Sequence, residues 1–100
     1  MVVKILYEFD VPAEKVPTLL QWLAEVAVPY FKKQPEIRDI HYNQTIVGKP
    51  MFVKVVTFAD LNAWASLMNK YQSDPKMQEI MGKFLSYTTH LETKLVMEVM

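Results

Sequence analysis

The spacing of hydrophobic residues changes repeatedly along this chain, and that change limits its fold more than any other feature. Residues 2–9 alternate between hydrophobic and polar, as a strand with one buried face does. The same period of two returns in residues 37–47, 51–58 and 88–99, which are rich in Val, Ile, Thr and aromatic residues. The pattern therefore predicts strands in these stretches.

Two helical stretches separate the predicted strands. The first begins near Pro17, which fits the first turn of a helix, and carries hydrophobic residues at three- and four-residue spacing through Phe31. Pro29 lies inside this pattern and predicts a kink or an early end. The second stretch begins after Asp60, a favourable N-cap, and is interrupted before Pro75, where Ser73 or Asp74 can cap a further short helix.

The resulting order is strand, helix, strand, strand, helix, strand, which predicts an α+β domain of ferredoxin-like βαββαβ topology. Gly48-Lys49-Pro50 supplies a turn between the middle strands, so these two strands should pair as a hairpin. Right-handed crossovers then give a four-stranded antiparallel sheet in the order 4-1-3-2, with both helical stretches on one face. Residues 1–100 form one domain, since no linker or low-complexity tract interrupts them.

The face of the sheet without helices should carry both hydrophobic and charged residues. By the alternation, its hydrophobic residues are Leu6, Ile40, Ile46, Val56, Phe58 and Val96. Its charged residues are Lys4, Glu8, Lys54, Glu92, Lys94 and Glu98. Two interpretations remain: a wet, salt-bridged dimer interface, which the regular alternation favours, or a bulge that shifts the alternation. A second sheet would cover such a face well, so we expect a homodimer through it.

Composition excludes several classes of partner and site. Eleven Lys and Arg residues balance eleven Asp and Glu residues, so no basic surface favours nucleic acid. The chain has no Cys, which excludes disulfides, thiolate metal sites and thiol nucleophiles. Only two Gly residues are present, too few for a phosphate-binding or dinucleotide-binding loop. No run of hydrophobic residues approaches the length of a membrane span and no signal-peptide pattern is present, so we predict no membrane partner and a cytoplasmic location.

The order of elements and two local segments resemble a known superfamily. One segment runs from Thr57-Phe58-Ala59-Asp60-Leu61 through Trp64 to Ser73-Asp74-Pro75, and the other is Pro29 to Pro35 before strand two. They are similar to segments of the dimeric α/β-barrel superfamily, which includes antibiotic-biosynthesis monooxygenases, haem-degrading monooxygenases, and NIPSNAP-like and EthD-like proteins. Glu36 departs from the pattern, which usually has glycine there. The resemblance implies a dimer whose subunits each have a cleft for a small, often aromatic or polycyclic ligand.

The resemblance disfavours haem degradation. The haem degraders use an Asn at the end of strand one, a Trp in helix two and a His in the helical stretch that follows. Strand one here ends in Glu8-Phe9-Asp10, and residues 76–81 contain no histidine, so only Trp64 can match. Several other members of the superfamily oxidise small ligands without metal or flavin, so no cofactor is expected.

Six residues are candidates for a site. Tyr7, His41 and His90 are the candidate catalytic groups, because histidine exchanges protons near neutral pH and Tyr7 could present a hydroxyl inside the cleft. Trp64, Met68 and Asn43 are candidate ligand-binding residues. A structural role is the alternative for each, and neither histidine has a partner spaced as in a metal site.

Two functions from different classes fit these expectations. The first is a monooxygenase-like enzyme that acts on a small apolar or aromatic compound without a cofactor. The second is a non-catalytic dimer that binds a small ligand or serves as an interaction module. The sequence leaves open whether the chain is an enzyme.

Overall fold

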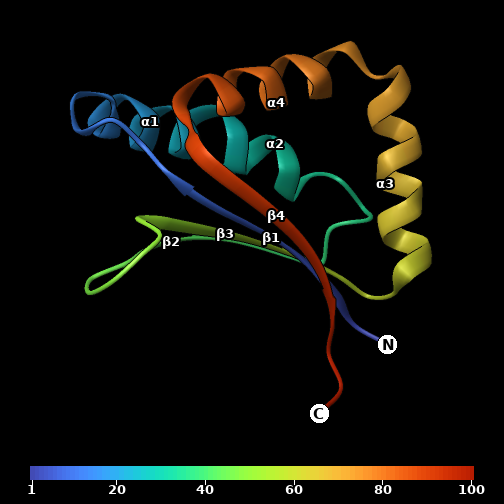
Figure 1. The fold of residues 1–100 in the computed structure, drawn as a ribbon. Coiled ribbons are helices and arrows are strands. Elements are labelled where there is room, and N and C mark those ends of the chain that lie inside the picture. Colours follow the sequence, from blue (N-terminus) through green and yellow to red (C-terminus); the bar gives the residue numbers. More distant parts are fainter.

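The fold consists of one four-stranded antiparallel sheet with helices on one side (Figure 1). The computed structural model describes residues 1–100. In Figure 1, α1, α2 and α4 lie on one side of the sheet, α3 descends beside it, and both termini lie at the same end. The strands are β1 (Val3–Asp10), β2 (Asp39–Gln44), β3 (Phe52–Phe58) and β4 (Thr89–Met97). The helices are α1 (Val16–Trp22), α2 (Val28–Lys32), α3 (Leu61–Ser73) and α4 (Pro75–Tyr87).

The sheet has the order β2-β3-β1-β4, which is the predicted order read from its other edge. All neighbouring strands are antiparallel. The α+β, ferredoxin-like fold predicted from the sequence is therefore confirmed. The middle strands are joined by the expected turn, where Gly48 has a φ of +101° that favours glycine.

The first helical stretch continues past the proline inside it. A short 3₁₀ turn (Ala13–Lys15) leads into α1, and a π-helical turn (Leu23–Ala27) joins α1 to α2. The backbone N–H of Val28 bonds to the carbonyl of Leu23, so the widened turn lies directly before Pro29. A wider turn is one way in which a helix accommodates a residue that cannot donate a backbone bond. The helix thus changes its winding before Pro29 instead of ending there.

Two aspartates begin the last two helices. The Asp60 side chain accepts a hydrogen bond of 2.9 Å from the backbone N–H of Ala63 at the start of α3. The Asp74 side chain accepts bonds from the N–H groups of Lys76 and Met77, at 3.0 and 3.2 Å, at the start of α4. Asp74, rather than Ser73, is therefore the cap of α4.

The predicted faces of two strands were wrong. Val56 and Phe58 are buried beneath the helices, as is Ile40. The register explains this, because Val56 lies opposite Ile5 and Phe58 opposite Val3, and both β1 residues belong to the core. Side chains that lie opposite one another in an antiparallel pair project from the same face.

Lys54 and Ile46 are also corrected. Lys54 shares the helix-facing side of β3 with Val56, so it is buried in the core and does not belong to the exposed face. Ile46 lies in the loop after β2 and is 98% exposed. On the exposed face the Lys94 Nζ donates to Glu8 Oε1 at 3.0 Å, so part of the expected charge pairing is present. The register shift between Glu8 and Asp10 concerns β1 and β4 only.

A single hydrophobic cluster fills the space between sheet and helices. Its largest fully buried side chains are Phe9, Phe52, Phe58, Phe84, Leu19 and Met77. Phe9 stacks on Phe52 across the two central strands, and Phe84 of α4 packs against Phe9 with its ring nearly perpendicular. None of the helices has the length and hydrophobicity that crossing a bilayer requires.

Candidate functional site

A cavity of about 270 Å³ lies between the helix-facing side of the sheet and helices α3 and α4. Its lining residues are almost all hydrophobic; the exceptions are Lys54 and Thr93. The sheet contributes Ile5, Tyr7, Lys54, Val56, Phe58, Leu91 and Thr93. The helices and the segment before β2 contribute Phe31, Ile37, Leu67, Met68, Tyr71, Met77, Met81 and Leu85. This is the composition of a small-molecule pocket, in which few polar groups orient an apolar ligand.

Lys54 is the only charged or polar residue in the buried core, with 2% of its surface exposed. Its Nζ forms no ion pair, and its partners are instead the faces of four aromatic rings. The distances from Nζ to the ring centroids are 4.7 Å for Tyr7 and Phe84, 5.0 Å for Phe31 and 5.5 Å for Tyr42. Aromatic faces attract a cation, so this cage partly offsets the loss of water around the amine.

Burial lowers the pKa of Lys54 from 10.5 to about 7. The cause is desolvation, because the ammonium form loses its water shell and no carboxylate replaces it. The cavity therefore holds an amine that exchanges its proton near neutral pH. In its neutral form such an amine is both a base and a nucleophile.

Register places Lys54 between two tyrosines. It lies opposite Tyr7 of β1 on one side and opposite Tyr42 of β2 on the other, and Tyr7 in turn lies opposite Thr93 of β4. These four residues form a row across the whole sheet, which we name the polar row. The row lies on the helix-facing side: Lys54 is buried, Tyr7 and Tyr42 are half-buried against the hydrophobic cluster, and Thr93 is exposed.

The two tyrosines of the polar row keep their protons at neutral pH. Burial raises the pKa of Tyr7 to about 12, with a smaller Coulombic contribution from Tyr71. Burial also raises the pKa of Tyr42, and Tyr7 adds to the effect. Both tyrosines therefore keep an O–H that can donate a hydrogen bond.

The structure brings together two of the six predicted site residues. Tyr7 and Met68 both line the cavity. Trp64 is half-buried on α3 and packs against the core but does not line the cavity. Its indole N–H is buried without a hydrogen-bond partner. A ligand-binding role for Trp64 stays a prediction.

The other three predicted residues lie away from the cavity. His41 and Asn43 project from the exposed face of β2; the His41 Nε2 lies 2.8 Å from Asp39 Oδ2, and Asn43 donates to the Val53 carbonyl at 3.4 Å. His90 is exposed at the start of β4, with its Nδ1 3.3 Å from Asp10 Oδ2. Catalytic roles for the two histidines stay predictions, and no contact joins them to Tyr7.

Sequence reasoning missed Lys54 and Tyr42. A signal for Lys54 was present, because Phe52, Val56 and Phe58 share its parity within β3 and make that side of the strand hydrophobic. A lysine in the middle of such a hydrophobic face either reaches solvent and interrupts the face, or is buried there and has a function. For Tyr42 the signal was weaker, since its strand has polar residues on both faces.

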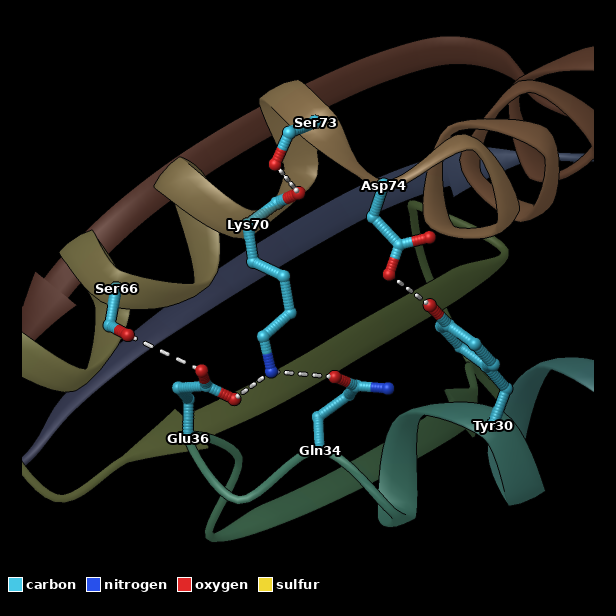
Figure 2. A network of polar contacts seen from close by, with 7 residues as sticks. All are labelled: Tyr30, Gln34, Glu36, Ser66, Lys70, Ser73 and Asp74. Carbon is cyan, nitrogen blue, oxygen red and sulfur yellow. Dashed lines mark hydrogen bonds and ion pairs between the residues drawn. The ribbon is translucent and has the colours of Figure 1, made fainter.

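A network of polar side chains fixes α3 beside the cavity (Figure 2). The Lys70 Nζ donates to Glu36 Oε1 at 2.9 Å and to Gln34 Oε1 at 3.0 Å, and the Ser66 hydroxyl donates to Glu36 Oε2 at 3.3 Å. Burial acts to raise the pKa of Glu36, but the hydrogen bond from Lys70 and weaker contacts outweigh it, so that pKa is lowered. These bonds join α3 to the segment between α2 and β2.

A second contact of the network holds the junction between α3 and α4. The Tyr30 hydroxyl donates to Asp74 Oδ2 at 3.1 Å, and Figure 2 shows this bond linking α2 to the start of α4. The pKa of Asp74 is lowered chiefly by its hydrogen bond from the Met77 backbone, with the Tyr30 hydroxyl also contributing. Side-chain hydrogen bonds from Ser66 and Lys70 thus hold α3, and the bond from Tyr30 to Asp74 holds the start of α4.

Stability should depend on pH through Lys54. Its pKa is about 7 in the folded protein, against 10.5 for an unburied lysine, so between these values the unfolded chain binds one more proton. The free energy of unfolding should therefore rise with pH above 7, by up to about 1.4 kcal/mol per pH unit from this group. Denaturant unfolding at pH 7, 8 and 9 measures this rise. Lys54→Met should abolish it, whereas Lys33→Met, at an exposed position, should retain it; an equal slope in both variants would contradict the assignment.

The sequence matches no known family model and no curated protein. Solved structures with the same fold are numerous. A variant of SnoaB, a cofactor-independent oxygenase from Streptomyces nogalater, is 14% identical, with a TM-score of 0.75 over 97% of this chain and 92% of that one. A NIPSNAP family protein from Agrobacterium tumefaciens is 14% identical, with a TM-score of 0.77 over 99% and 94%.

An EthD family protein from Bacillus halodurans is 18% identical to this chain. Its TM-score is 0.72, and the match covers 99% of this chain and 100% of that one. At these identities the similarity concerns the fold alone. It agrees with the superfamily that the sequence resembles: the chain has the ferredoxin-like fold of the SnoaB, NIPSNAP and EthD proteins.

Proposed function

We propose that the cavity binds a small, largely apolar compound that carries one acidic hydroxyl, such as a phenol or an enol, and that Lys54 takes the proton of that hydroxyl. The carrying observation is the single amine, without an ion pair, in an otherwise hydrophobic cavity. Proton transfer from hydroxyl to amine creates an ammonium and an oxyanion side by side. The oxyanion of the ligand then pairs with the ammonium of Lys54, which has no anionic partner without the ligand.

The dimensions of the cavity limit the ligand. At about 270 Å³ it lies just below the usual range of roughly 300–1,000 Å³ for small-molecule pockets. Compounds of about one or two rings therefore fit better than larger polycyclic ones. The methionines at the helix side, Met68, Met77 and Met81, can adapt their flexible side chains to such a ring system.

Deprotonation prepares the ligand for reaction with molecular oxygen. A phenolate or enolate is electron-rich at carbon, so it can transfer electrons to O₂ and form a carbon–oxygen bond without a metal or flavin. With 1-naphthol as substrate, oxygen adds at the ring carbon opposite the hydroxyl, and loss of one water from the hydroperoxide leaves 1,4-naphthoquinone. SnoaB shows that a protein of this fold can be a cofactor-independent oxygenase. The first proposed function is therefore a monooxygenase-like enzyme.

A non-catalytic binding protein is the second candidate. The observation that favours it is that both histidines lie away from the cavity, which leaves no imidazole beside Lys54 to move protons during turnover. In this case Lys54 fixes the ligand's oxyanion and no oxygen is consumed. The two candidates share the same binding step and differ only in turnover.

Binding and turnover are tested together with 1-naphthol. We expect calorimetry to show binding by the natural protein and at least tenfold weaker binding by Lys54→Met, because the variant cannot accept the proton. Naphthalene, which lacks the hydroxyl, serves as the control ligand and should bind both proteins equally. Oxygen uptake with formation of 1,4-naphthoquinone supports the enzyme, and binding without uptake supports the binding protein. Equal affinity of both proteins for 1-naphthol would overturn the proposed role of Lys54.

We also propose that the protein is a homodimer through the exposed sheet face. This face carries Leu6, Val55 and Val96 beside the Glu8–Lys94 ion pair. Val96 of β4 is 38% exposed on this face, apolar surface that a partner would cover. The whole face is open on the side opposite the helices (Figure 1).

Light scattering tests the dimer. The expected mass in solution is twice the 11.7 kDa of one chain. Val55→Glu, at the centre of the exposed face, should shift the equilibrium toward monomer because it would bury an unpaired charge between the sheets. Leu20→Glu is the matched control, since Leu20 is 44% exposed on the helical side, and it should leave the mass unchanged. A natural protein that runs as a monomer at micromolar concentration would contradict this proposal.

A further inference from the structure

We propose that Lys54 is also a nucleophile and forms a Schiff base with small apolar aldehydes that enter the cavity. The inference uses the cavity described above but does not need the reaction with oxygen. It concerns a covalent carbonyl-binding activity of the chain, and it follows from the surroundings of one nitrogen atom.

The first observation is that the amine is unengaged. Lys54 forms no salt bridge, whereas Lys70, Lys76 and Lys94 all pair with carboxylates. It lines the cavity, so a bound molecule can reach it. A lysine that burial keeps partly neutral at pH 7 and that no carboxylate holds has a lone pair free for attack on carbon.

The second observation is that the aromatic cage suits the product. The rings of Tyr7, Phe31, Tyr42 and Phe84 surround the nitrogen at 4.7 to 5.5 Å. A protonated Schiff base is a cation at the same nitrogen, so the ring faces that attract an ammonium also attract it. The hydrophobic walls favour condensation, because the water that is released leaves a cavity with few groups to retain it.

The chemistry balances without a further reagent. The Nζ lone pair attacks the carbonyl carbon, a proton moves from nitrogen to oxygen, and the carbinolamine loses one water to give the C=N bond. Tyr7 lies beside Lys54 in the register and keeps its hydroxyl protonated, so it can protonate the departing hydroxyl group. The Schiff-base nitrogen keeps its own proton as a cation, and the Tyr7 phenolate regains a proton from solvent. No oxidant, reductant or metal takes part.

The walls determine which carbonyl compounds react. Lys54 is the only cationic group among the lining residues, and its nitrogen becomes part of the C=N bond, so a phosphate or carboxylate elsewhere on the aldehyde would find no second cation to pair with. Benzaldehyde matches the cavity in both size and polarity. Pyridoxal phosphate, a charged aldehyde that modifies exposed lysines, serves as the opposite probe.

Reductive trapping tests the inference. The natural protein is incubated at pH 7 with benzaldehyde and sodium cyanoborohydride, which converts a Schiff base into a stable benzylamine, and peptide mapping locates the benzyl group. We expect Lys54 to be labelled at least tenfold faster than exposed Lys33, and excess 1-naphthol to slow labelling at Lys54 alone. With pyridoxal phosphate the preference should reverse, and Lys54 should remain unlabelled.

The result that overturns the inference is labelling by benzaldehyde that is no faster at Lys54 than at Lys33. Mapping on the natural protein needs no variant, so loss of folding in Lys54→Met cannot obscure it. The outcome is separable from that of the oxygenase proposal. If 1-naphthol binds through Lys54 but benzaldehyde is not trapped there, the nucleophile inference alone fails; trapping without 1-naphthol binding would reject the other proposal.

Discussion

Burial of one unpaired amine is the constraint on which the rest of this structure depends. Transfer of a charged group from water into a hydrophobic core is costly unless a partner compensates. Here compensation comes from aromatic ring faces around the Lys54 Nζ and from partial loss of its proton, since burial lowers its pKa to about 7. A core that tolerates this cost retains a reactive amine that is largely shielded from water.

The fold positions that amine through strand register. Lys54 lies on β3, one of the two central strands, opposite Tyr7 on one side and Tyr42 on the other. Strand pairing alone therefore places a tyrosine on each side of it. Helix α4 then places Phe84 over the amine, and α3 contributes Leu67 and Met68 to the lining of the cavity. The polar network of Figure 2 secures α3 to the segment before β2 and the start of α4 to α2. Backbone pairing therefore defines the reactive row, and side-chain bonds hold its cover in place.

Local chemistry explains why the fold could be predicted from the sequence. Alternation of hydrophobic residues identified the strands, Asp60 and Asp74 mark two helix starts through hydrogen bonds made within their own turn, and Gly48 marks the hairpin. The candidate site could be predicted only in part, since two of the six candidates, Tyr7 and Met68, line the cavity. β3 is hydrophobic on both faces, so its register with β1, not its alternation, decides the side on which Lys54 lies. His41 was chosen for its chemistry, yet its strand turns it to the exposed face.

Direct titration of Lys54 tests the central claim most directly. Lysine side chains enriched in carbon-13 report their protonation state through the chemical shift of Cε, and comparison with Lys54→Met assigns the Lys54 signal. The account predicts a midpoint near pH 7 for this one lysine, because burial without a carboxylate partner lowers its pKa to about 7. A Lys54 signal that titrates near 10.5, as an exposed lysine does, would show that the amine is hydrated or paired, and would contradict the account of the cavity.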